Sequence, residues 1–119
     1  MISIFRHTAS RALLLAPLLA AGVADAASFS CRGTLAADEA AICADCDLAQ
    51  LDVKMATLYV TAGKFMAMGA RGDLHDTQVA WLARRKLCDG DVACLRTSYQ
   101  ARIDELNEII QAIASRGPF

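Results

Sequence analysis

The chain has 119 residues, of which 55% are hydrophobic and 21% charged, and its formal net charge is −1 at neutral pH. This balance argues against a nucleic-acid-binding protein, which requires a concentration of basic side chains. The high apolar fraction and the low number of prolines, two in all, argue against intrinsic disorder. The length allows one small domain.

Residues 1–26 have the features of an export signal. Arg6 and Arg11 make the first segment positive, an uncharged stretch rich in Leu and Ala follows, and small residues stand at Ala24 and Ala26, the positions that a signal peptidase reads. The uncharged stretch is shorter than the roughly 20 residues that span a bilayer. We therefore expect cleavage after Ala26 and no membrane span in the mature chain.

The remaining segment, 27–119, is expected to mature in the periplasm or outside the cell as one domain. The leader contains two of the 12 basic residues and one of the 13 acidic ones, so the mature chain has a net charge near −2. A domain of this size buries only about 60–65% of the surface that its unfolded chain exposes, so disulfides are a useful source of stability.

The hydrophobic pattern of this domain has a helical period. A short helix is expected from Leu35 to Cys43, followed by a longer one from about Asp47 to Met68, where apolar residues recur at spacings of three and four. The inward residues of the longer helix are expected to be Leu48, Leu51, Met55, Leu58, Ala62 and Phe65.

Glycines then predict the end of that helix. The segment 69–72, Gly-Ala-Arg-Gly, is expected to break it, and Asp73 with Asp76 predicts the capped start of a helix from about Leu74 to Leu87.

Asp89-Gly90-Asp91 predicts a tight turn in which Asp91 caps the last helix. The inward residues of that helix are expected to be Leu95, Tyr99, Ile103, Leu106, Ile110 and Ile113. No segment alternates apolar and polar residues long enough to indicate a strand. The expected fold is therefore all-α, a small disulfide-stapled bundle of three to four helices.

Four of the five cysteines form two close pairs along the chain. Short loops close most easily, so we expect the disulfides Cys31–Cys43 and Cys88–Cys94, with Cys46 as a free thiol. Antiparallel packing of neighbouring helices brings the cysteines to one end of the bundle, so crossed pairings stay open.

Cys43 and Cys46 also have the C-x-x-C spacing of redox proteins. A helix rather than a strand is expected before them, and Asp45 and Asp47 disfavour a thiolate by charge repulsion. A structural disulfide with a spare thiol is the preferred interpretation, and a thiol-redox helper is the alternative. The spare thiol of Cys46 also allows a disulfide-linked dimer.

No metal or cofactor is expected. A zinc site made of cysteines is conceivable but disfavoured in an oxidising compartment. Its members would be Cys43, Cys46, Cys88 and Cys94. The turn Asp89-Gly90-Asp91 is too short to be a calcium-binding loop.

Catalytic candidates are few, and we expect no enzyme activity. His75 is the only histidine after the leader and is interpreted as a solvated first-turn residue. Glu39 and Asp52 resemble the carboxylate pair of a glycosidase in residue type only, and salt bridges to Arg85 or Arg102 explain them equally well.

Several residues are of types that dominate binding interfaces. They are Tyr59, Trp81, Arg85 and Tyr99. Core packing is the preferred interpretation for Trp81 and Tyr99, whose polar atoms then find local partners.

Two ordered motifs resemble the lysozyme-inhibitor LprI-like family. The first reads Glu39-x-x-Ile42-Cys43-x-Asp45-x-x-Leu48-x-x-Leu51-Asp52 and is followed by Tyr59. The second reads Gln78-x-x-Trp81-Leu82-x-x-Arg85-x-x-Cys88 and is followed by Cys94-Leu95-x-x-x-Tyr99-x-x-Arg102. The resemblance extends from Cys31 to Leu106 and implies a small exported α-helical domain. The motif residues that we expect to be structural are Glu39, Asp52, Tyr59, Gln78, Trp81, Arg85, Tyr99 and Arg102.

The family takes its name from the inhibition of lysozyme, so the resemblance implies a protein that binds lysozyme or a related wall-degrading enzyme and blocks substrate access. Lysozymes are typically basic, and a negative surface would speed their association. The candidate partner-binding residues are Asp45, Asp47, Asp89 and Asp91. Helix capping is the plainer explanation for Asp47 and Asp91. A structural or scaffolding module of the cell envelope, bound to another protein, is the alternative function.

Overall fold

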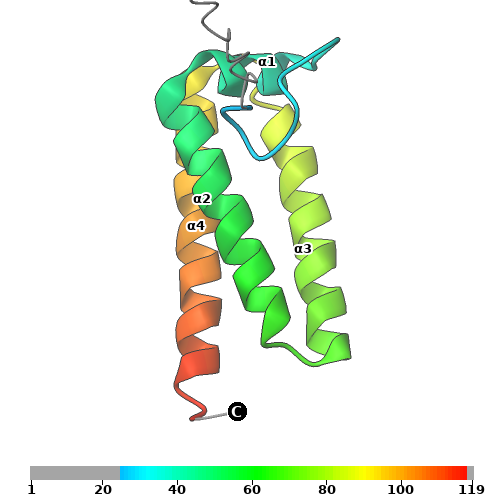
Figure 1. Ribbon diagram of the computed structural model, residues 1–119, viewed down its shortest axis with the longest axis vertical. Coiled ribbons are helices and arrows are strands. Elements are labelled where there is room, and N and C mark those ends of the chain that lie inside the picture. The colour runs from blue at the N-terminus through cyan, green and yellow to red at the C-terminus, as the bar shows by residue number, and fades with distance from the viewer. Residues whose placement is uncertain (1–24, 118–119) are drawn as a thin grey trace, which may run out of the picture.

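Four α-helices make up the part of the chain that this computed structural model describes, residues 25–117 (Figure 1). They are α1 (Ala37–Ala44), α2 (Cys46–Lys64), α3 (Met68–Lys86) and α4 (Val92–Ala114). The all-α prediction is therefore confirmed. The expected leader, apart from Asp25 and Ala26, lies outside the described residues.

Asp45 separates α1 from α2 and serves both helices. Its backbone N–H donates to the Ala41 carbonyl at the end of α1, and its carboxylate accepts the Leu48 backbone N–H at 2.9 Å in the first turn of α2. The N-cap of α2 is therefore Asp45, and the expectation that Asp47 fills this role is wrong. Asp47 lies within the first turn instead, where the helix dipole favours an acidic residue.

The turn between α2 and α3 lies earlier than the sequence predicts. α2 ends at Lys64, and residues 69–72, expected to break the chain, belong to the beginning of α3. Asp73 and Asp76 lie exposed on α3 and do not cap it, because Ala67 is at the N-cap position.

An arginine side chain explains the position of this turn. The Arg71 guanidinium donates to the carbonyls of Gly63 and Met66 at 3.0 and 3.1 Å. The first bond satisfies an acceptor in the last turn of α2, where the helix leaves carbonyls without partners, and the second holds the turn that follows. A glycine inside a helix costs only about 1 kcal/mol relative to alanine, so Gly69 and Gly72 are accommodated in α3.

The turn before α4 agrees with the prediction. The Asp91 carboxylate accepts the Cys94 backbone N–H at 3.0 Å and caps α4. Asp89 has a φ of 48°, in the left-handed region that Asp tolerates better than most residues.

The core forms where α2, α3 and α4 face one another. α2 and α4 run in the same direction and α3 runs opposite to both, with α1 across one end (Figure 1). Most of the predicted inward residues are buried, and Leu51, Leu58 and Ile110 are half-buried. Phe65 is a wrong prediction: it is 55% exposed, because α2 ends one residue before it and it leaves the apolar face of that helix.

None of the described helices combines the length and the apolar composition that crossing a membrane requires.

Candidate functional site

Two disulfides lie at the end of the bundle that α1 covers, which we call the closed end. It comprises α1, the start of α2, the end of α3, the connection 87–91 and the start of α4. Cys31 is bonded to Cys43 and Cys88 to Cys94, with Cα separations of 5.8 and 5.6 Å, which confirms the predicted pairing.

Cys46, the first residue of α2, is an exposed free thiol. Because Cys43 is bonded to Cys31, the C-x-x-C pair is not bridged in this state. Disulfides also occupy three of the four cysteines considered for zinc. Within residues 25–117, no three His, Cys, Asp or Glu side chains are grouped in a way that suits a metal ion.

The four candidate aspartates all lie at the closed end, but their carboxylates have different roles. Asp45 and Asp91 accept capping hydrogen bonds. Asp47 is exposed and lies 3.7 Å from the Arg96 guanidinium. Asp89 is exposed, and its side chain makes no hydrogen bond or ion pair within residues 25–117. Asp89 is therefore the member whose charge is most available to a partner.

An apolar side chain accompanies Asp89. Leu87 is 83% exposed at the beginning of the connection that leads to Asp91, and the Cys88–Cys94 disulfide closes this connection. Backbone bonds from Asp89 to Lys86 and from Asp91 to Cys88 restrain it further. A restrained segment loses little conformational entropy when it binds, so Leu87 and Asp89 form a preorganised pair.

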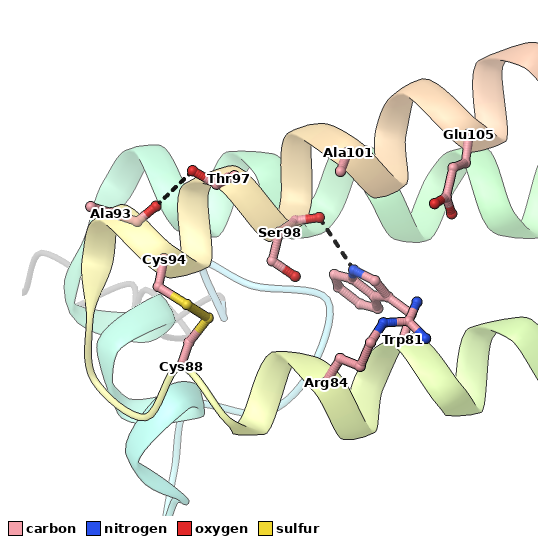
Figure 2. Close-up of a pocket in the computed structure, with 9 residues that line it drawn as sticks. All are labelled: Trp81, Arg84, Cys88, Ala93, Cys94, Thr97, Ser98, Ala101 and Glu105. Atoms are coloured by element: carbon pink, nitrogen blue, oxygen red, sulfur yellow. Dashed lines mark hydrogen bonds between the residues drawn. A yellow bond between two sulfur atoms is a disulfide. The ribbon is translucent and has the colours of Figure 1, made fainter.

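A groove of about 620 Å³ lies between α3 and α4, beside the same disulfide. Figure 2 shows Trp81 on α3 pointing toward Ser98 on α4, and its indole N–H donates to the Ser98 carbonyl at 3.2 Å. Trp81 is 3% exposed, so it closes the inner side of the groove, while Arg84 and Glu105 are exposed along its length.

A chain of buried polar contacts lies beneath the closed end. The Arg85 guanidinium donates to the Asp38 carboxylate at 2.9 Å and to the Tyr99 hydroxyl at 3.1 Å. That hydroxyl donates to the Asp52 carboxylate at 2.8 Å. Asp38, Asp52 and Arg85 are 2%, 1% and 4% exposed, so this cluster holds ionised groups away from water.

Burial and charge shift the titration of the cluster. Burial raises the pKa of Tyr99 well above its ordinary value, and Asp52 adds to the effect although Arg85 opposes it. Burial by itself lowers the pKa of Arg85, but Tyr99 and Asp38 outweigh it, so the pKa of Arg85 is raised. Arg85 therefore stays charged and Tyr99 neutral at physiological pH.

A second buried arginine lies near the middle of α4. Arg102 Nε donates to the Gln78 side-chain oxygen at 3.0 Å, and the Gln78 amide contacts the Met55 sulfur at 3.1 Å. The other Arg102 nitrogens reach Glu105 at 2.9 Å and Thr77 at 3.2 Å. Since Met55, Gln78 and Arg102 come from three helices, this cluster joins α2, α3 and α4.

Most residues of the two sequence motifs are buried in or beside these clusters. Trp81, Arg85 and Tyr99 are buried, and Asp52 lies 4.0 Å from Arg85, as a salt-bridge role requires. Glu39 differs: its carboxylate accepts the backbone N–H of Ala36 at the start of α1, and Arg85 and Arg102 pair with other carboxylates.

Two further residues differ from the expectations drawn from the sequence. Asp38, which is not among the predicted site residues, pairs with Arg85 in place of its neighbour Glu39. The feature of the sequence that could have indicated its burial is its position four residues before the apolar Ile42, on the inward face of α1. His75 is exposed beside Asp76, but it lies beyond the first turn of α3 because that helix begins at Met68. Tyr59 is half-buried.

No protein-family model, no curated protein and no solved structure matches this chain.

Proposed function

We propose that this chain is an exported, non-catalytic protein that binds lysozyme or a related wall-degrading enzyme and blocks its substrate cleft. The motif resemblance supports the class of partner. The observation that carries the proposal is the restrained connection at the closed end, where the apolar Leu87, 83% exposed, stands two residues before the exposed Asp89.

Electrostatics supports a basic partner. Asp47, Asp89 and Asp91 are exposed at the closed end, and the Asp89 carboxylate has no competing partner within residues 25–117. A basic enzyme approaching this end gains in association rate, and salt reduces the gain because the charges are in water.

The exposed side chain of Leu87 supports a direct contact with the partner. Burying a Leu side chain that is nearly fully exposed contributes about 1.5–3 kcal/mol. The Cys88–Cys94 disulfide holds the main chain around Leu87 before binding, so little of that energy is lost to ordering.

The test is lysozyme-driven clearance of a bacterial cell-wall suspension, titrated with oxidised residues 27–119. We expect saturable inhibition that reduction and alkylation abolish. Leu87→Ser should raise the inhibition constant at least tenfold, because the variant removes the apolar contact and leaves the core intact. Absence of inhibition against every lysozyme class would overturn the proposal.

Association rates distinguish the contribution of the Asp89 charge from that of the Leu87 contact. Asp89→Asn keeps a residue that accepts the left-handed backbone, so it removes only the charge, and it should slow association more at low salt than at high salt. Asp73→Asn is the matched control, because Asp73 is exposed on α3 near the opposite end. Equal rates for the two variants would remove Asp89 from the mechanism.

Exposed Cys46 supports a second candidate, a structural module of the cell envelope joined as a dimer through this thiol. Non-reducing electrophoresis of protein recovered from the envelope tests it directly. A dimer band that Cys46→Ser removes would support the scaffold function, and a monomer band alone would reject the linkage.

A further inference from the structure

The buried cluster beneath the closed end contains more negative than positive charge. Asp38 and Asp52 each carry a carboxylate, and within residues 25–117 Arg85 is the one guanidinium that both approach, at 2.9 and 4.0 Å. Tyr99 donates a hydrogen bond to Asp52 but brings no charge. A buried carboxylate without a matching positive charge costs several kcal/mol, so one more positive charge beside the cluster would stabilise it.

The beginning of the described chain lies against this cluster. The Ser28 backbone N–H donates to the Asp52 carboxylate at 2.6 Å, and the Arg85 guanidinium lies 5.8 Å from the Phe29 ring centre. Ala27 is 8% exposed and belongs to the core. In Figure 1 this segment, drawn in blue, folds between α2 and α3 at the end that α1 covers.

Ala27 is the first buried residue of this segment, and Ser28 after it is exposed again. Asp25 and Ala26 are exposed, whereas Ala27 is buried. The boundary falls at the Ala26–Ala27 bond, where the leader pattern predicts cleavage. The backbone nitrogen of Ala27 lies one residue before that of Ser28, about 3–4 Å along the chain, so it is already near the Asp52 carboxylate.

We propose that Asp52 is a binding site for an α-ammonium group, and that its ligand is the new N-terminus formed by cleavage of the Ala26–Ala27 bond. A signal peptidase hydrolyses this bond with one water: the Ala26 carbonyl leaves as a carboxylate on the leader, and the Ala27 nitrogen becomes an ammonium. The ammonium supplies the missing positive charge, so removal of the leader stabilises the folded domain.

The site faces charged or polar groups from all four helices: Asp38 of α1, Asp52 of α2, Arg85 of α3 and Tyr99 of α4. Asp52 is the nearest to Ser28 and hence to the new terminus. The pKa of an α-amino group is ordinarily about 7.7–8.0, and the neighbouring carboxylate raises it. The added stability is therefore present below about pH 8 and is lost as the pH rises through the higher folded-state pKa.

The experiment compares three forms of residues 27–119 at pH 7: one that begins with a free Ala27, one acetylated there, and one with Gly-Ser before Ala27. The segment holds all four helices, both disulfides and every buried side chain described, and it lacks the hydrogen bond from the Cys31 backbone N–H to the exposed Asp25 carboxylate. We expect the free form to have a Tm about 4–8 °C above the other two, because only it places an ammonium beside Asp52.

Asp52→Asn is the matched variant, since it keeps the shape of the side chain and removes its charge. In this variant the difference between the free and acetylated forms should disappear. The pH dependence is a second test that needs no variant: the difference should shrink from pH 7 to pH 10. Equal Tm values for the three forms, or a difference that persists in Asp52→Asn or at pH 10, would overturn the proposal.

Export of the full chain in a bacterium with a periplasm tests the cleavage step. The mass of the exported protein should correspond to an N-terminus at Ala27. A mature chain that begins at any other residue would contradict the proposal, because its ammonium would lie away from Asp52.

Discussion

The two buried arginines of this bundle have opposite kinds of surroundings. Arg85, at the closed end, is paired with the buried Asp38 and lies near the buried Asp52. Arg102, in the middle of α4, has the neutral Gln78 and Thr77 as partners, and its ionic partner Glu105 is about half exposed.

This difference shows how each region accommodates a buried guanidinium group. At the closed end the ionic partners of the arginine are themselves buried, because α1 and the segment before it cover the carboxylates. In the middle of α4, Arg102 pairs with Glu105, whose side chain is half exposed to water. The buried partners of Arg102 can therefore be neutral. A change at Arg85 therefore leaves unmatched buried charge, whereas a change at Arg102 leaves unmatched hydrogen bonds, which costs less.

The largest effect is expected from Arg85→Met. The variant removes the guanidinium that pairs with the buried Asp38 and lies near the buried Asp52, and breaking a buried pair in this way costs about 3–5 kcal/mol. Urea unfolding of the oxidised domain measures the loss. Adding Asp38→Asn to the variant should recover part of it, because one of the unmatched charges is removed. A loss under about 1 kcal/mol would show that water reaches the cluster, since an exposed ion pair contributes no more than that.

The next effect concerns the disulfide that ties the N-terminal segment to α1. Replacing Cys31 and Cys43 by Ala should cost about 3 kcal/mol, the loop-closure entropy of a separation of 12 residues. The same replacement of Cys88 and Cys94, separated by six residues, should cost about 2 kcal/mol. Both variants carry Cys46→Ser to prevent exchange. If the second pair proves the more costly one, the loop model fails here and the connection 87–91 is the critical element.

Arg102→Met is expected to cost about 1–3 kcal/mol, because the Gln78 oxygen and the Thr77 hydroxyl lose a donor. The comparison with Arg85→Met under the same urea conditions tests the difference between the two regions. The double variant Arg102→Met/Gln78→Met, which removes both partners, should be the more stable of the two Arg102 variants. Equal losses for Arg85→Met and Arg102→Met would contradict the comparison.

The sequence predicts the helices and the disulfides well, because these depend on local patterns. Apolar spacing, the Asp91 cap and the short separations between cysteines are visible without a structure. The turn between α2 and α3 differs from the prediction, because the bonds from Arg71 to Gly63 and Met66 outweigh the tendency of glycine to end a helix.

The buried cluster was harder to predict for a different reason. The sequence shows Asp38 and Glu39 side by side, and only the rotation of α1 against α3 decides which of them meets Arg85. Arg85 and Tyr99 were recognisable as unusual residue types, but their burial depends on packing among elements far apart in the chain. Likewise, nothing local indicates that Leu87 is exposed while the similar residue Leu95 is buried.

The smallest effect concerns Tyr99 at high pH, and it tests how well the closed end excludes water. An unfolded chain ionises this tyrosine near its ordinary pKa of 10.0, whereas burial keeps the folded-state pKa higher. Between these values the unfolded state binds fewer protons than the folded one. The free energy of unfolding should therefore fall above pH 10, by up to about 1.4 kcal/mol per pH unit, with no contribution from this group at lower pH.

Tyr99→Phe removes this titration and provides the control. The variant should be less stable at pH 7, because the Asp52 carboxylate loses a donor, yet its stability should fall less steeply above pH 10. Urea unfolding at several pH values in a Cys46→Ser background measures both slopes. Parallel slopes would mean that the folded protein ionises Tyr99 as readily as the unfolded chain. Water would then reach the Arg85 cluster as it reaches Glu105, and the contrast between the two regions would be lost.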